Sequence, residues 1–200
     1  MGEQSQRFVS RAGEKLDAAM EAFGLDVRSA VCADFGCNVG GFTDCLLKRG
    51  AAKVYAIDTG YGALAWKLRK DSRVVVMERT NALYFEPPEP VDLVTIDMAW
   101  TVQQLAIPAA RRWLKQSGDS AGPDGCAEPG GGRIVALLKP HYELAKMQSH
   151  KPASAMTEEQ ARGVCLNVCQ ALAAGGCVPA AVMQSVLIGK GGNCEFLLLV

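Results

Sequence analysis

The sequence predicts an α/β fold with a doubly wound, mostly parallel sheet of seven strands. Short apolar runs alternate along the chain with segments whose apolar residues recur at helical spacing. The last two runs are joined by a glycine-rich turn, which allows an antiparallel hairpin at the C-terminus. Ligands in such sheets bind at the carboxyl ends of the strands. The predicted strands span residues 31–35, 52–57, 73–77, 92–97, 133–138, 178–188 and 194–200.

Composition indicates one globular domain over residues 1–200, with 49% hydrophobic and 21% charged residues. No apolar run approaches the length of a membrane span, and no signal peptide opens the chain. We therefore expect a cytoplasmic protein without a membrane partner. The net charge is zero, so a nucleic-acid partner requires a local basic patch. The eight cysteines lack a Cys-x-x-Cys pair and are expected to be reduced core thiols, with no metal site.

Helices are predicted where apolar residues return every three or four positions. The first lies in an N-terminal helical segment, residues 1–25. The last begins with a capping box of Thr157 and Gln160 and ends near residue 174. Residues 117–132 are rich in Gly, Pro, Ser and Asp and are expected to form a flexible loop. The other predicted helices start at residue 41 and span residues 61–70 and 103–115.

A glycine turn follows the first strand and predicts a ligand site. Glycines there let the backbone approach a ligand closely, and the following helix offers free N–H groups. The order Asp34-x-Gly36-x-x-x-Gly40-Gly41 differs from the dinucleotide fingerprint. A carboxylate at Asp34 would repel a pyrophosphate but suits the cationic amino-acid tail of S-adenosylmethionine.

A second acid, Asp58, ends the next strand, where a carboxylate can accept hydrogen bonds from both ribose hydroxyls of an adenosine. Thr80 and Asn81 follow the third strand, where it would meet the adenine. A turn acid at Asp34 or a cap at Asp58 stays open for each residue alone. Two acids at consecutive strand ends favour the cofactor.

Two further strands end in charged residues. Asp97 ends the fourth, and Lys139 follows the wholly apolar end of the fifth. A charged lysine in such a place is costly unless it is paired, so its presence points to a function.

Seven segments of the chain together resemble a known family. They are residues 10–16, 40–46, 54–62, 78–82, 95–97, 139–140 and 192–197. The match runs nearly end to end and resembles the FtsJ-type methyltransferases, most closely the TlyA (hemolysin A) branch. It implies the Rossmann-like class I methyltransferase fold and S-adenosylmethionine as cofactor. The residues expected to bind this cofactor are Asp34, Gly36, Cys37, Asn38, Gly40, Gly41, Phe42, Asp58, Thr59, Thr80, Asn81 and Asp97.

The resemblance also implies methylation of ribose 2′-hydroxyls in RNA, with ribosomal RNA as the expected substrate, by a Lys-Asp-Lys-Glu tetrad. The matching positions are Lys15, Asp97, Lys139 and Glu195. Lys139 is the candidate base; if it stays charged, it would orient the hydroxyl and stabilise the developing alkoxide. Taken singly, Lys15 also fits a solvated helix lysine and Glu195 an edge-strand surface acid.

Three departures from the family concern the substrate. An S4 RNA-binding domain usually precedes the stretch at Ser10, and few residues precede it here, so a separate RNA-binding partner is an expectation. Ala99 and Trp100 replace the usual Ser-Phe, and residues 141–155 replace a Gly-rich segment. Arg7, Ser10 and Arg11 are candidate RNA contacts. Arg7 and Arg11 belong to a basic set that could track phosphates, and a solvated face stays open for the members of this set on helices. That set also contains Lys15, Lys48, Arg49, Lys53, Lys67, Arg69 and Lys70.

Three interpretations follow from these residues. The first is a ribose 2′-O-methyltransferase acting on RNA. The second keeps the cofactor but changes the substrate. The third is a binding or accessory protein that retains the fold without turnover.

Overall fold

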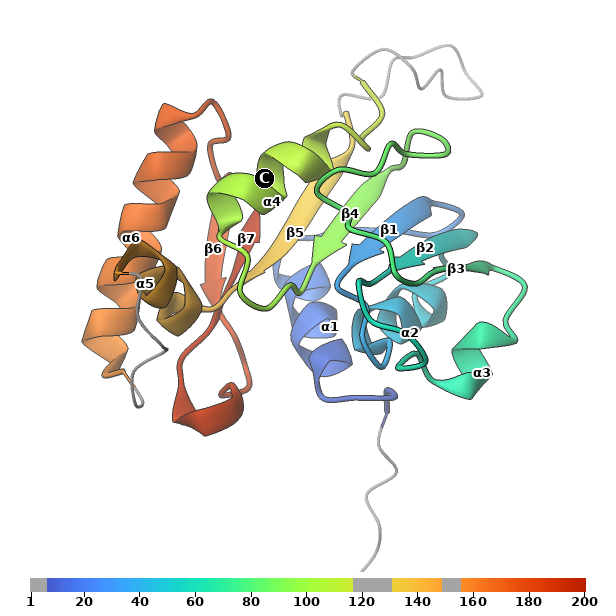
Figure 1. Ribbon diagram of the computed structural model, residues 1–200, viewed down its shortest axis with the longest axis horizontal. Helices are drawn as coiled ribbons and strands as arrows, with labels where there is room; N and C mark the ends of the chain where they lie inside the picture. Colours follow the sequence, from blue (N-terminus) through green and yellow to red (C-terminus); the bar gives the residue numbers. More distant parts are fainter. Residues whose placement is uncertain (1–6, 117–130, 149–155) are drawn as a thin grey trace, which may run out of the picture.

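Seven strands form one sheet in the computed structural model, which describes residues 7–116, 131–148 and 156–200. The strand order is β3-β2-β1-β4-β5-β7-β6 (Figure 1). Strands β1 to β5 pair in parallel, and β7 runs antiparallel to both β5 and β6. The fold class predicted from the sequence is confirmed. The strands are β1 (Val31–Phe35), β2 (Lys53–Ile57), β3 (Val74–Met77), β4 (Leu93–Ile96), β5 (Arg133–Leu138), β6 (Ala181–Gln184) and β7 (Phe196–Leu199).

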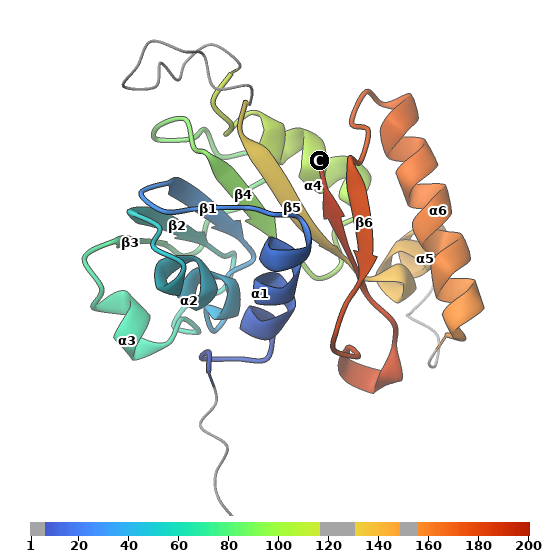
Figure 2. The same ribbon diagram turned by 180° about the vertical axis from the view of Figure 1, so that it is seen from behind.

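Helices cover both faces of the sheet (Figures 1 and 2). One face carries α1 (Ala12–Ala22), α2 (Gly41–Lys48) and α3 (Trp66–Arg69). The other carries α4 (Gln103–Arg111), α5 (Pro140–Gln148) and α6 (Glu158–Ala174), with α5 beside α6. A short 3₁₀ helix, η1 (Lys190–Gly192), lies between β6 and β7.

Each face of the sheet has its own apolar core, because successive side chains of a strand point to opposite faces. Ala33 of β1 packs with Trp113 in the layer beneath α4 and α6. Its neighbour Cys32 packs with Leu16 and Leu46 in the layer beneath α1 and α2. Burial on both faces explains why the parallel strands read as continuous apolar runs.

Two predicted helices are shorter than expected. The helix predicted over residues 61–70 contains only Trp66–Arg69, because Gly62 has a φ of 77° and the Ala65 N–H bonds to Val39 O. The helix predicted over residues 103–115 ends at Arg111. Beyond it, the backbone of residues 113–115 pairs with Val91 instead of continuing the helix.

Helix α5 was not expected, since residues 141–155 read as a polar stretch. It starts at Pro140, and proline is favoured in the first turn of a helix because its missing N–H needs no partner there. The strand predicted over residues 178–188 is limited to Ala181–Gln184, because a turn held by the Ser185 side chain follows it. The predicted strand over residues 194–200 is Phe196–Leu199.

The capping box, the cysteines and the search for membrane spans bear on further predictions from the sequence. Thr157 and Gln160 form the predicted capping box of α6. The cysteines of the described residues are all free, and those residues contain no group of ligands suited to a metal. No helix among them is long and apolar enough to cross a membrane. Residues 117–130 of the expected flexible loop, and residues 1–6 of the N-terminal segment, lie outside the described residues.

Candidate functional site

The carboxyl ends of the parallel strands meet at one edge of the sheet, the lower edge in Figure 1. The N–H groups of Gly36 and Cys37 donate to Ile57 O at 2.9 and 3.0 Å, and the Asp97 N–H donates to Phe35 O at 2.9 Å. The Asp58 N–H donates to Met77 O at 3.0 Å. These bonds bring the turns after β1, β2 and β4 side by side.

A cavity of about 540 Å³ lies at this edge. It is lined by the segment before α1, the glycine turn, the ends of β4 and β5, the start of α5 and the loop between β6 and β7. Four different parts of the chain supply the tetrad, and all four residues line this one cavity. Its predicted site residues are Ser10, Arg11, Lys15, Asp34, Gly36, Cys37, Asn38, Gly41, Phe42, Asp97, Lys139 and Glu195.

The tetrad forms two ion pairs. Lys15 Nζ of α1 pairs with Glu195 Oε2, and Lys139 Nζ lies 2.5 Å from Asp97 Oδ1. The side chains of Lys15 and Glu195 are 11% and 4% exposed, so the alternatives of a solvated lysine and a surface acid are wrong. Two cations and two anions in one small space balance in charge, which limits the cost of burying them.

Glycines let the segments that line the cavity approach one another closely. A side chain at Gly36, whose φ is 82°, would place its Cβ 2.8 Å from Asp97 O. A Cβ at Gly41 would overlap the Ser10 hydroxyl, and one at Gly189 would overlap the Glu195 carboxylate. The lining segments therefore pack against one another more closely than any other residue type allows at these positions.

Asp34 is fully buried beneath the glycine turn. Its carboxylate accepts hydrogen bonds from Thr43 Oγ1 at 2.7 Å and Thr95 Oγ1 at 3.1 Å. Burial raises the pKa of Asp34 to about 7, against the opposing effect of these hydroxyls. A cationic group in the cavity would favour the charged form of this acid, as the cofactor prediction requires.

Asp58 does not line this cavity, but two backbone N–H groups hold its side chain beside the glycine turn. Its two carboxylate oxygens accept from Asn38 N at 2.9 Å and Gly60 N at 2.7 Å. Each oxygen keeps a further lone pair for a ligand. The Thr80 N–H bonds to Asp58 O at 3.0 Å, which places the end of β3 next to this acid. Gly40, Thr59, Thr80 and Asn81 likewise do not line the cavity; Asn81 instead accepts from Leu83 N in a turn.

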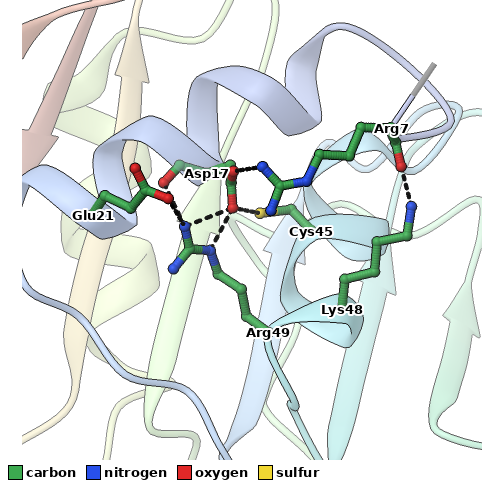
Figure 3. Close-up of polar contacts among 6 residues, drawn as sticks. All are labelled: Arg7, Asp17, Glu21, Cys45, Lys48 and Arg49. Atoms are coloured by element: carbon green, nitrogen blue, oxygen red, sulfur yellow. Dashed lines mark hydrogen bonds and ion pairs between the residues drawn. The ribbon is translucent and has the colours of Figure 1, made fainter. Parts of the chain in front are cut away.

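Most of the predicted basic set is paired with acids within the chain. Asp17 of α1 binds both Arg7 and Arg49 (Figure 3). Asp44 binds Lys48 and Lys67. Lys53 and Arg69 pair with Glu89 and Glu78. Arg11 donates to Ile188 O at 3.1 Å, and both residues line the cavity. The expected phosphate-tracking surface is therefore partly neutralised, since Arg7 and Arg49 share Asp17 and the two lysines share Asp44.

The structure adds cavity residues that sequence reasoning did not assign. His141 and Tyr142 line the cavity from α5, and Ile188 and Gly189 line it from the loop after β6. The centroid of the Tyr142 ring lies 4.2 Å from the centroid of the His141 ring and 4.8 Å from that of the Trp100 ring. In the sequence, the glycines that precede Glu195 could have indicated this loop, and Pro140 could have indicated the start of α5.

The fold, the glycine turn and the acids at the strand ends define a methyltransferase of the S-adenosylmethionine-dependent class. The chain belongs to the FtsJ-like methyltransferase family, whose model matches residues 8–200. S-adenosylmethionine is therefore the cofactor, as predicted. The cavity fits it: about 540 Å³ lies beside the glycine turn, with Asp34 among the lining residues.

Relatives place the chain in the TlyA branch. It is 38% identical over 201 residues to the 16S/23S rRNA (cytidine-2'-O)-methyltransferase TlyA of Mycobacterium tuberculosis, covering 98% of this chain and 69% of the relative. It is 36% identical to YqxC of Bacillus subtilis, a candidate rRNA methyltransferase, over 96% of this chain and 65% of YqxC. The chain thus spans about two thirds of the length of these relatives.

Solved structures agree on the fold. A candidate hemolysin from Streptococcus thermophilus superposes with a TM-score of 0.81 at 32% identity, covering the whole of this chain and 68% of that one. The N-methyltransferase NodS of Bradyrhizobium japonicum superposes with a TM-score of 0.58 at 13% identity, over 95% of this chain and 97% of NodS. The second likeness concerns the fold alone.

Proposed function

We propose that this protein transfers a methyl group from S-adenosylmethionine to a ribose 2′-hydroxyl of RNA, with ribosomal RNA as substrate. The observation that carries the proposal is the shared cavity of Lys15, Asp97, Lys139 and Glu195 beside the glycine turn. The names of the relatives TlyA and YqxC supply the substrate class.

The bound cofactor supplies an electrophilic methyl group on its sulfonium. The chain must then align the acceptor oxygen in line with that methyl and manage the hydroxyl proton. Lys139 lies at the cavity and is oriented by Asp97. A neutral Lys139 would take the proton, whereas a charged Lys139 would hold the hydroxyl and stabilise the alkoxide. Lys15 and Glu195 complete the charge balance on the other side.

Methyl transfer from labelled cofactor tests the proposal directly. The substrates are total RNA, unmodified ribosomal particles and a protein extract, all from cells that lack this protein, with Lys139→Ala as control. We expect alkali-resistant label in RNA that the variant does not produce, while calorimetry shows cofactor binding by both proteins. Label that enters RNA equally with Lys139→Ala would remove this lysine from the mechanism.

A second candidate keeps the chemistry and changes the acceptor. It is favoured by the ion pairs that most members of the predicted basic set form with acids of the same chain. Label in the protein extract and none in RNA would establish it. Cofactor binding without label in any sample would favour a binding protein without turnover. The RNA-binding partner expected in place of an S4 domain, and the RNA contacts at Arg7, Ser10 and Arg11, stay predictions.

A further inference from the structure

Gln103, the first residue of α4, contacts the chain on both sides of Lys139. Its side-chain Nε2 donates to Leu137 O at 3.1 Å, just before the lysine. Its backbone N–H donates to Glu143 Oε1 at 2.8 Å, one helical turn after the lysine. One residue of α4 therefore holds the bend where β5 becomes α5. We call these two hydrogen bonds the Gln103 clamp.

The clamp is buried: Gln103 is 2% exposed and Glu143 is 4% exposed. A buried carboxylate costs free energy unless it is hydrogen-bonded, and a helix N-terminus presents N–H groups without helical partners. Capping of α4 explains the bond between Glu143 and the Gln103 N–H. It does not explain the second bond, from the Gln103 side chain to the strand that carries Lys139.

The clamp joins the two chain segments that leave the tetrad. The segment after Asp97 leads from β4 to Gln103, and the segment after Lys139 leads from β5 to Glu143. Asp97 and Lys139 face each other at 2.5 Å between these segments. A change in the distance between α4 and α5 would move the lysine relative to its acid.

We propose that Gln103 and Glu143 are positioning residues that fix Lys139 against Asp97 and toward the cavity. The catalytic consequence rests on the proposed function, whereas the placement of the lysine does not. Misplacing a reacting group by about 1 Å can cost roughly 100-fold in rate. Loss of the clamp should therefore lower kcat and leave the cofactor residues of β1 and β2 and of the turns after them unchanged.

Glu143→Ala, Glu143→Gln and Gln103→Leu test the catalytic consequence, with Glu159→Ala on the exposed face of α6 as matched control. We expect kcat to fall about tenfold or more in Glu143→Ala and Gln103→Leu. Glu143→Gln should stay within about threefold of wild type, because its amide oxygen can still accept from the Gln103 N–H. The dissociation constant for the cofactor should stay within about twofold in all four variants.

Wild-type kcat in Glu143→Ala, or equal losses in Glu143→Ala and Glu143→Gln, would overturn the clamp. Thermal unfolding is measured for each variant. If Glu143→Ala does not fold, Gln103→Leu decides the catalytic result, because it leaves the cap of α4 in place.

A readout without substrate separates the clamp from the proposed function. Lysines are reductively methylated with ¹³C, and the Lys139 resonance is identified by its loss in Lys139→Arg. We expect this resonance to shift in Glu143→Ala and Gln103→Leu, to return in Glu143→Gln and to stay in place in Glu159→Ala. An unshifted resonance overturns the clamp whatever the enzyme does. A shift in a protein that methylates no RNA would support the clamp and contradict the RNA substrate.

Discussion

Lys15 and Glu195 form a buried ion pair although 180 positions separate them in the chain. This contact joins α1 to the residue just before β7, and both residues line the cavity. Four elements must therefore fold together before the tetrad exists.

Removing one member of this pair should cost more stability than removing both. Lys15→Met or Glu195→Met leaves an uncompensated buried charge and should lower the free energy of unfolding by about 3 kcal/mol. The double variant should recover most of that loss but no methyl transfer. Chemical denaturation measures the stabilities, with the exposed Arg162→Met as control. Additive losses in the double variant would contradict the coupling.

Asp58→Ala should weaken cofactor binding. The Asp58 carboxylate is held by the Asn38 and Gly60 N–H groups with lone pairs to spare, and a hydrogen bond to a charged group contributes about 1.5–3 kcal/mol. The dissociation constant for S-adenosylmethionine should rise by about 10- to 100-fold in calorimetry. Asp71→Asn, in a partly exposed pair with Arg73, is the control. An unchanged constant in Asp58→Ala would remove this acid from the cofactor site.

Asp17→Asn should destabilise the protein by about 2–3 kcal/mol, because Asp17 is buried and binds both Arg7 and Arg49. Asp26 also pairs with an arginine, Arg28, but both groups are exposed. Asp26→Asn should therefore leave the melting temperature unchanged. Similar effects of the two substitutions would show that the ion pairs of Asp17 drawn in Figure 3 do not stabilise the folded protein.

The strand ends were readable from the sequence, whereas the contacts between distant elements were not. Asp34, Asp58, Asp97 and Lys139 each follow an apolar run, and runs of this kind end at one edge of a parallel sheet. Lys15 entered only through the family resemblance, since nothing near it in sequence reveals a partner beyond residue 190.

The ion pairs between residues on different helices could not be predicted from the sequence either. Arg49 looks like one member of a basic surface, but its partner Asp17 lies on another helix. Helix α5 was missed because its start, with His141, Tyr142 and Glu143, shows no clear apolar stripe. Its polar residues are explained only by the cavity and the Gln103 clamp.

Two glycine substitutions should have opposite effects. Gly36→Ala places a Cβ 2.8 Å from Asp97 O at a φ of 82°, which should cost about 2 kcal/mol or more and reduce cofactor binding. Gly163 lies within α6 with open space around it, so Gly163→Ala should stabilise the protein by about 0.5–1 kcal/mol. Denaturant unfolding checks both signs, and a stabilising Gly36→Ala would contradict the close approach of the turn to β4.

Glu143 should make stability depend on pH. Burial raises the pKa of Glu143 to about 7 from an ordinary value of 4.5, and the Gln103 N–H opposes part of that rise. The folded protein thus holds this proton more tightly than the unfolded chain. Its contribution to stability is complete below pH 4.5 and is lost as the pH rises to about 7, by at most about 3 kcal/mol.

Glu143→Gln isolates this effect, because Asp34, whose pKa is also raised to about 7, is present in both proteins. The amide keeps the hydrogen bond and cannot ionise. The variant should therefore gain stability relative to wild type between pH 5 and pH 8, as measured by denaturant unfolding at each pH. A constant difference across this range would show that the Glu143 carboxyl titrates alike in the folded and unfolded chains. A difference of opposite sign would show that the N-terminus of α4 holds Glu143 charged in the folded protein.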